Sequence, residues 1–168
     1  MTLAELNRAD RVTFVQALGG VFEHSPWVAE AAWHARPFAR VTDLHAAMLA
    51  AVAEAGHERR LALIRAHPEL AGKAAIRGEL TAASTSEQSG AGLSACTPDE
   101  CARLTDLNAR YNAKFGFPFI LAVRGYDRAG VIAEFERRIG HAAEEELAEN
   151  LRQIGRITAL RLQSLIDE

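Results

Sequence analysis

The chain has 168 residues, of which 49% are hydrophobic, 24% charged and 7% aromatic, and its formal net charge is −3. These values are typical of a soluble globular domain, and they exclude a disordered, collagen-like or disulfide-stapled chain. A net acidic chain without a basic run is not expected to bind nucleic acid. Composition therefore sets the class of molecule and leaves its chemistry open.

The expected compartment follows from the chain ends and the cysteines. The first residues lack the basic and apolar regions of a signal peptide, and no apolar run reaches the roughly 18 residues of a membrane span. We therefore expect a cytoplasmic protein without membrane contact. Cys96 and Cys101 have neither CxxC nor metal-site spacing, and we expect both to be reduced thiols.

Helix signals begin early in the chain. Asp10 is expected to cap a helix that stops before Gly19, and Ser25, followed by a proline, marks a second helix start. Thr42 is expected to cap a longer, alanine-rich helix that ends at Gly56. The first third of the chain is therefore predicted to be helical.

The middle of the chain continues this pattern. A short helix should end near His67, because Pro68 disfavours helical geometry in the residue before it. Two capping boxes follow, at Ser84–Glu87 and Thr97–Glu100, and each predicts a helix start. The second helix carries apolar residues at offsets of three and four and should stop at Gly116.

The last third contains one segment that is not helical. The run Phe117–Val123 looks like a strand, but a single strand cannot form a sheet and this one contains Pro118. A helix around Val131–Phe135 follows, and a last helix runs from about residue 142 to residue 166. With no repeat or linker, we predict an all-α fold, a single-domain bundle of about eight helices over residues 1–168.

Arg161 does not fit a plain helical core. It lies on the apolar stripe of the last helix, which consists of Leu147, Leu151, Ile154, Thr158, Arg161 and Leu165. One interpretation is that its stem packs along the stripe while its guanidinium reaches water. The other is that it lies at the wall of a pocket and binds a carboxylate.

His67 and Glu87 also have two interpretations each. The backbone of His67 is pinned by Pro68, and its side chain suits proton transfer near neutral pH, although a lone histidine is often structural. Glu87 can complete the capping box by accepting from the Ser84 amide. Its polar surroundings at a helix start are also typical of a site that attracts anions.

Motifs for metal and nucleotide chemistry are absent from the sequence. There is no HExxH, P-loop or GxSxG, and the ExxH spacing at Glu54–His57 lacks the second copy that a di-iron site needs. If the protein is an enzyme, we expect it to use neither a metal nor an organic cofactor.

Three segments in this order resemble the family of 2-oxo-4-hydroxy-4-carboxy-5-ureidoimidazoline (OHCU) decarboxylases, which form (S)-allantoin in urate breakdown. They are Ile64–Gly72, Ser84–Leu93 and Phe115–Ile120, and Leu18–Trp27 and Leu160–Leu162 are also similar. The resemblance covers nearly the whole chain. Glu69 departs from it, since the family commonly has aspartate there.

The resemblance implies a cytoplasmic, all-helical homodimer that decarboxylates OHCU without a cofactor or metal. His67 would be the catalytic acid/base, with Glu87 assisting. The implied substrate-binding residues are Pro68, Ser84, Thr85, Ser86, Gln88, Phe119, Ile120, Leu121, Ala122, Val123 and Arg161.

Two other functions are compatible with the residues alone. A non-catalytic helical module could use Phe117–Val123 as a partner-binding surface, which would require an exposed apolar patch. A metal-dependent hydrolase could be built on the scattered histidines, and it would lose activity on chelation.

Overall fold

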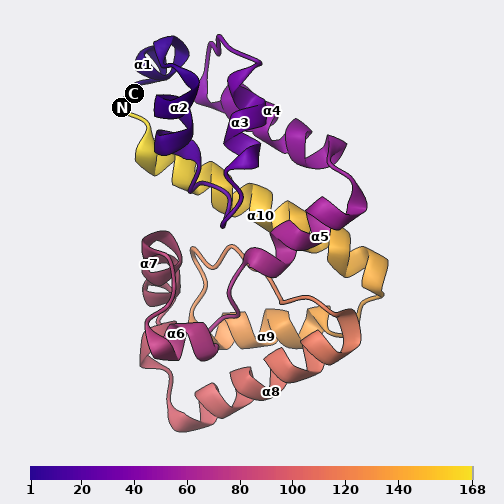
Figure 1. Cartoon of the computed structure of the whole chain (residues 1–168). Helices are drawn as coiled ribbons and strands as arrows, with labels where there is room; N and C mark the ends of the chain where they lie inside the picture. The colour runs from indigo at the N-terminus through magenta and orange to yellow at the C-terminus, as the bar shows by residue number, and fades with distance from the viewer. Residues whose placement is uncertain (168) are drawn as a thin grey trace. The chain divides into compact units, whose positions relative to one another are not determined.

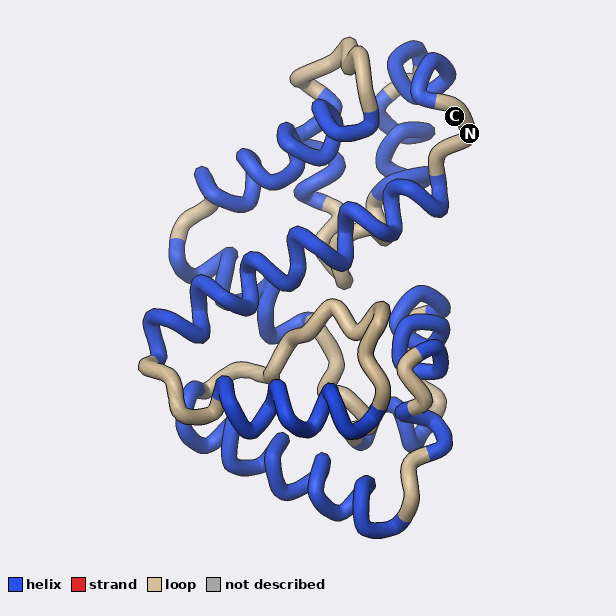
Figure 2. The backbone as a smooth tube through the Cα atoms, turned by 180° about the vertical axis from the view of Figure 1, so that it is seen from behind, coloured by secondary structure: helices blue, strands red, loops and turns tan. Residues whose placement is uncertain are grey.

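The computed structural model describes residues 1–167, and of Ala74 it describes the backbone only. These residues form ten α-helices and one short 3-10 helix, with loops but no strand between them (Figures 1 and 2). The predicted all-α class is therefore confirmed. Within the same range, no helix is both long and apolar enough to cross a membrane.

Residue contacts divide the chain into two compact units. Unit 1 consists of Met1–Ala66 together with the chain from Ile154 onward, and unit 2 consists of His67–Gln153. The chain passes from one to the other directly between residues 66 and 67 and returns inside the last helix. Neither passage is a loop of linker composition, which explains why the sequence shows no boundary.

Unit 1 is built around a core of aromatic and aliphatic side chains. Its helix α3 packs against both α2 and α4. The helices are α1 (Leu3–Arg8), α2 (Arg11–Leu18), α3 (Trp27–Trp33), α4 (Val41–Glu54), α5 (His57–Ala66) and the later part of α10 (Ala143–Leu165). Fully buried core residues include Phe14, Leu18, Phe22, Val28, Leu44, Met48, Leu63, Ile64 and Leu162.

Helix starts in unit 1 agree only in part with the sequence. Asp10 caps α2 as predicted, since its side chain accepts from the backbone of the third helical residue. Ser25 is not a cap, because its hydroxyl donates to the Glu23 carbonyl oxygen at 2.9 Å. Thr42 lies inside α4, whose start is instead closed by Asp43 accepting from the Arg40 amide at 3.1 Å.

Unit 2 contains the remaining helices and the irregular apolar segment. They are α6 (Lys73–Arg77), α7 (Ala82–Gly90), the 3-10 helix η1 (Leu93–Ala95), α8 (Pro98–Phe115), α9 (Arg128–Arg138) and the first part of α10. The predicted capping box at Thr97 is confirmed, and α8 ends at Gly116, whose φ of +76° favours glycine.

The start of α7 differs from the prediction. The helix begins at Ala82 rather than after Ser84, and Thr81 is its cap, with Oγ1 accepting from the Ser84 amide at 3.2 Å. The capping role predicted for Glu87 is therefore wrong, because the Ser84 amide, which Glu87 was expected to bond, donates to Thr81 instead. Several Ser and Thr residues in one run could each serve as the cap, and sequence spacing alone selected the wrong one.

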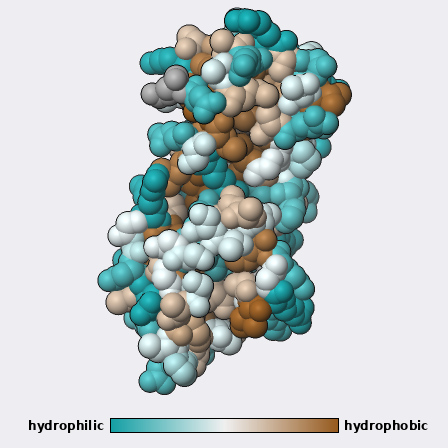
Figure 3. Space-filling model, turned by 90° about the vertical axis from the view of Figure 1, so that its left-hand side faces the viewer, coloured by the Kyte–Doolittle hydropathy of each residue, from teal (hydrophilic) through white to brown (hydrophobic). Residues whose placement is uncertain are grey.

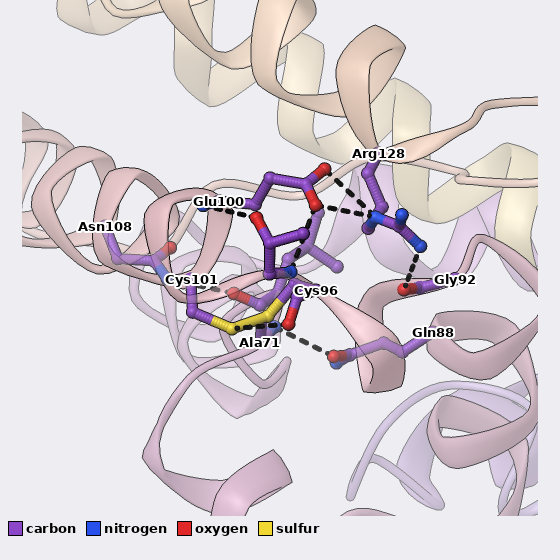
Figure 4. Close-up of a disulfide and its surroundings, with 10 residues drawn as sticks. Ala71, Gln88, Gly92, Cys96, Glu100, Cys101, Asn108 and Arg128 are labelled. Carbon is purple, nitrogen blue, oxygen red and sulfur yellow. Dashed lines mark hydrogen bonds and ion pairs between the residues drawn. A yellow bond between two sulfur atoms is a disulfide. The ribbon is translucent and has the colours of Figure 1, made fainter.

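The two cysteines are joined, which corrects the expectation of reduced thiols. Cys96 and Cys101 form a disulfide, and their Cα atoms are 5.6 Å apart, within the usual range for this bond (Figure 4). The chain between them contains the Thr97 capping box at the start of α8. The turn from η1 into α8 brings the two residues together, and their spacing in the sequence carries no signal of it.

Replacing both Cys96 and Cys101 by alanine should lower the free energy of unfolding by about 2 kcal/mol. The reason is that the disulfide reduces the conformational entropy of the unfolded chain, and the variant loses this constraint. Thermal unfolding with and without a dithiol reductant measures this effect. The reductant should lower the Tm of the wild type and leave that of the double variant unchanged. A wild-type Tm indifferent to reductant would contradict the bond.

His45 should make unit 1 sensitive to mild acid. Its ring Nε2 lies 3.0 Å from Thr158 Oγ1, and burial lowers the pKa of His45 below its ordinary 6.5. The unfolded chain then binds this proton more readily, so stability is highest above pH 6.5 and falls as the pH drops toward the lowered pKa.

Denaturant unfolding at about pH 7.5 and about pH 5.5, on either side of the ordinary histidine pKa, measures this effect. The loss of stability between the two values should be smaller in His45→Gln than in the wild type. The exposed His57 supplies the control, because His57→Gln should leave the wild-type loss unchanged. If the wild type and His45→Gln lose equal stability between the two pH values, His45 is not the cause of the acid sensitivity.

Candidate active site

His67 is the first residue after α5, as predicted from the proline that follows it. Its side chain is buried, with 6% of its surface exposed. It opens a loop that ends at Gly72, in which Ala71 adopts a φ of +50°, a conformation that non-glycine residues seldom adopt. Such a loop needs bonds from neighbouring elements to hold it.

Gln88 on α7 supplies two of these bonds. Its Oε1 accepts from the Ala71 amide at 2.9 Å, as Figure 4 shows, and its Nε2 donates to the Glu69 carbonyl at 3.3 Å. The two partners lie 17 and 19 residues earlier in the sequence. Gln88 therefore brings the loop after His67 against α7, and both ends of its amide are used in doing so.

Two asparagines of α8, which sequence reasoning missed, hold the same loop from the other side. Asn108 Nδ2 donates to the Leu70 carbonyl at 3.0 Å, and Asn112 Nδ2 donates to Glu69 Oε1 at 2.6 Å. Gly72 makes room for the glutamate, since a Cβ at this position would lie 2.7 Å from the Cβ of Glu69. Glu69, which is longer than the aspartate common in the family, is thus accommodated beside Gly72 and hydrogen-bonded to Asn112.

The polar residues of α7 fall on two faces. Ser84 and Gln88 are buried and Glu87 is half-buried, and their spacing places these three on one face of the helix. Thr85 and Ser86 are exposed, and the Thr85 hydroxyl donates to the Thr81 carbonyl at 2.9 Å. Figure 3, which faces the side of α6 and α7, shows mostly pale and teal residues on the lower part of the surface.

The segment Phe117–Val123 is buried rather than exposed. Phe119, Ile120, Leu121 and Val123 each expose less than 5% of their surface, and Ala122 is half-buried. This overturns the interpretation of the segment as an exposed partner-binding surface. Phe119 stacks on Phe135 with ring centroids 3.9 Å apart, which anchors the segment on α9.

Side chains, rather than a second strand, bond the backbone of this segment, which is drawn as a loop in Figure 2. Asn150 Oδ1 accepts from the Ile120 amide at 3.0 Å, and Asn150 Nδ2 donates to the Pro118 carbonyl at 3.1 Å. Arg138 Nη1 donates to the Ile120 carbonyl at 2.6 Å, and Gln153 Oε1 accepts from the Ala122 amide at 3.0 Å. These contacts resolve the problem of a strand-like run without a sheet.

A polar cluster supports these bonds, and its members Arg138, Glu146 and Tyr111 are fully buried. Arg138 pairs with Glu146 at 2.9 Å, Tyr111 donates to the same carboxylate at 2.6 Å, and His141 Nδ1 lies 3.0 Å from it. Burial, together with the hydrogen bond to Glu146, raises the pKa of Tyr111 far above its ordinary value, so the phenol stays protonated and donates. Sequence reasoning missed this cluster, because charged helix residues are usually exposed.

Arg161 belongs to unit 1, and its side chain is buried. It exposes 7% of its surface, and its Nη1 donates to Glu23 Oε2 at 2.9 Å and to the Val21 carbonyl at 3.2 Å. The interpretation of a side chain that snorkels to solvent is therefore wrong. Glu23, exposed by only 2%, is the carboxylate that it binds, and sequence reasoning missed it.

The scattered histidines do not form a cluster. Across residues 1–167, no three His, Cys, Asp or Glu side chains are grouped as a metal site would require.

Comparison with known proteins identifies the family. The sequence matches the family model described as OHCU decarboxylase over residues 7–163. The chain belongs to the OHCU decarboxylase family. This confirms the resemblance carried by the His67, Ser84 and Phe115 segments, and it makes the chain a member of a family of carboxy-lyases of urate degradation.

Individual relatives agree with this assignment. The chain is 41% identical to the OHCU decarboxylase of Haloferax volcanii, over 96% of this chain and 94% of that one. It is 39% identical to the OHCU decarboxylase of Mus musculus, over 99% and 93% of the two chains. Among solved structures, an (S)-allantoin synthase has a TM-score of 0.81 and 32% identity, and the match covers 99% of this chain and 55% of that one.

Removing one partner of the buried pair between Glu23 and Arg161 should be strongly destabilising. Glu23→Gln removes the negative charge next to a buried guanidinium, and we expect it to lower the free energy of unfolding by about 3 kcal/mol. The control is Glu30→Gln, which breaks the solvent-exposed pair of Glu30 with Arg11 and should have a much smaller effect. Equal losses in urea unfolding would contradict a special role for the buried pair.

Proposed function

We propose that this chain decarboxylates OHCU to (S)-allantoin, with His67 as acid/base and Glu87 assisting. The observation that carries this proposal is the family match over residues 7–163. The structure supports it further, because the loop that begins at His67 is hydrogen-bonded through Gln88 to the face of α7 on which Ser84 and Glu87 lie.

The substrate contains its own electron sink. When the bond from C4 to the carboxylate breaks, its electron pair forms a double bond to C5, and the imine electrons move to the ring nitrogen, which takes a proton. C5 then takes a second proton while the C4 hydroxyl loses its proton and becomes the carbonyl of allantoin. CO2 leaves, and the reaction consumes one proton in total. No redox or electron-accepting cofactor is needed for this balance.

The protein has to orient the carboxylate, handle the hydroxyl proton and deliver a proton to one face of C5. A buried histidine on a pinned backbone suits the proton transfers, which are typically worth about 10²- to 10⁴-fold. We assign the hydroxyl side to His67 and Glu87. Positioned donors on developing charge are typically worth a further 10² to 10³, roughly, for each donor.

Most of the remaining predicted site residues are assigned to substrate binding. Pro68, Ser84 and Gln88 lie on the loop and the α7 face, and Phe119–Val123 would line the ring site chiefly with backbone groups, since most of its side chains are buried. The family resemblance also implies a substrate contact for Arg161, and that contact stays a prediction. We leave Thr85 and Ser86 out of the proposed site, because they lie on the exposed face of α7.

A homodimer and a cytoplasmic location remain expectations from the family. Sedimentation of the purified protein tests the first. The second is tested by fractionation of cells that produce the protein.

Activity is tested with freshly made OHCU and metal-stripped protein, followed by circular dichroism. Spontaneous decay protonates C5 on either face and gives racemic allantoin, whereas the enzyme should produce an optically active product. If the protein does not accelerate formation of (S)-allantoin, the proposal is wrong. If activity disappears on stripping and returns with added metal, a metal-dependent reaction replaces it.

His67→Asn should lower kcat/KM by at least about 100-fold, because it removes the group that exchanges protons with the substrate. The helical circular dichroism of the variant should be that of the wild type. The matched control is His57→Asn, at the exposed start of the same helix α5, which should retain wild-type rates. Activity of His67→Asn close to that of the control would exclude His67 as the acid/base.

A further inference from the structure

The side-chain hydrogen bonds to the backbone of residues 118–122 all fall on even-numbered residues. They involve the Pro118 carbonyl, the amide and carbonyl of Ile120, and the Ala122 amide. In an extended chain, the amide and carbonyl of one residue point to the same side, and those of the next residue point to the opposite side. The even-numbered residues therefore present one edge of the backbone to Arg138, Asn150 and Gln153.

The odd-numbered residues then present the other edge. Among the described residues, no backbone group of residues 117–122 bonds another backbone group. We infer from this alternation that the amide and carbonyl of Phe119 and of Leu121 are directed away from Asn150 and Gln153. Both residues lie within the range that we propose to line the ring of the substrate. Whatever fixes the first edge consequently fixes the direction of the second.

Two side chains of α10 have the spacing needed to hold the first edge of this backbone. Asn150 and Gln153 are three residues apart, so they lie on one face of the helix, about 4.5 Å apart along its axis. Their backbone partners, Ile120 and Ala122, are about 6.7 Å apart in an extended chain. The longer side chain of Gln153 makes up the difference, and the helix can serve as a substitute for a neighbouring strand.

Asn150 is held in one orientation. Its Oδ1 accepts from Ile120 and from Arg138 Nη2 at 2.8 Å, and its Nδ2 donates to Pro118 and to the Tyr111 hydroxyl at 3.2 Å. All four hydrogen-bonding positions of the amide are used, and the side chain is fully buried. Reversing the amide would place donors against donors, so the side chain has a single setting.

We propose that Asn150 and Gln153 are positioning residues for the reaction: they hold one edge of the Phe117–Val123 backbone so that the other edge meets the substrate in a fixed orientation. Neither side chain is assigned a contact with the substrate. The inference rests on the proposed function, because it takes residues 119–123 as part of the substrate site.

The first test uses Gln153. Gln153→Met keeps the approximate size of the side chain but removes the acceptor for the Ala122 amide, whereas Gln153→Glu keeps an acceptor there. Gln153 Nε2 also donates to Glu149 Oε1 at 2.7 Å, so the matched rescue is the double variant Glu149→Gln/Gln153→Glu, which exchanges the two groups without changing the net charge.

We expect Gln153→Met to raise KM for OHCU at least about tenfold and to lower the enantiomeric excess of the allantoin formed, after subtraction of the uncatalysed reaction. Neither quantity depends on how much of the enzyme is folded, so a purely structural role would not change them. The double variant should recover both. Hydrogen exchange of the Ala122 amide, followed by NMR, should be about tenfold faster in Gln153→Met and should recover with the rescue.

The second test uses Asn150→Asp, which keeps the acceptor for Ile120 and loses both donors. It should lower the enantiomeric excess and raise KM in the same way. The control is Asn7→Asp in unit 1, since Asn7 accepts from the Phe38 amide at 2.8 Å and donates to the Phe38 carbonyl at 2.9 Å. The control loses the same kind of bond, and its KM and enantiomeric excess should remain those of the wild type.

The outcomes separate the two proposals. If the wild type turns over OHCU but Gln153→Met and Asn150→Asp retain its KM and stereochemistry, the positioning role is wrong and the proposed function stands. If Asn7→Asp changes KM as much as Asn150→Asp does, the effect is general destabilisation and the inference also fails. A wild type without turnover would overturn the proposed function and, with it, the catalytic role of this contact.

Discussion

Two opposite charges, on Arg138 and Glu146, are held 2.9 Å apart with both side chains fully buried. Removing such charges from water costs several kcal/mol per ion, roughly, and the cost is offset only when hydrogen bonds occupy the remaining donors and acceptors. Here Tyr111 supplies a donor to the carboxylate, while the Ile120 carbonyl and the Asn150 amide oxygen accept from the guanidinium. Because the guanidinium is satisfied partly by the backbone of an irregular segment, the ion pair and that segment require each other. An apolar run without a sheet can therefore remain buried in an all-helical protein.

Carboxamide side chains bond the backbone of two irregular segments of unit 2. Gln88 and Asn108 bond the backbone of the loop after His67, and Asn150 and Gln153 bond that of the segment before α9. An amide side chain can donate and accept at once without carrying a charge. This matters in a site that is proposed to act on a carboxylate, because further fixed charges there would compete with those that orient the substrate. The loops hold chemically useful groups, and side chains of regular helices hold the loops, four of them neutral amides and one the charged Arg138.

Much of the fold and part of the candidate site could be predicted from the sequence. The helices and contacts that the sequence did not reveal were missed for physical reasons. The amphipathic period, the Thr97 capping box and Gly116 located α8 correctly, because a long helix with a clear apolar face leaves a strong pattern. The short helices α1 and α6 were missed, since five or six residues carry little periodicity. The family resemblance supplied the candidate site, but it could not show that Arg161 binds Glu23 or that Arg138 is buried, because helix patterns treat charged residues as exposed. A signal for the cluster did exist: Glu146, Asn150 and Gln153 recur at helical spacing beside the apolar stripe of α10.

The division of the chain has a consequence for how the molecule is made. Helix α10 follows every other helix in the sequence, yet unit 2 needs its first part for Glu146 and Asn150, and unit 1 needs its later part for Thr158 and Arg161. During synthesis on the ribosome, neither unit can complete its core until this helix has emerged, so both wait with apolar surface uncovered. The usual order, in which the N-terminal part folds first, is not open to this chain. Its early helices therefore stay incompletely packed until α10 has been made.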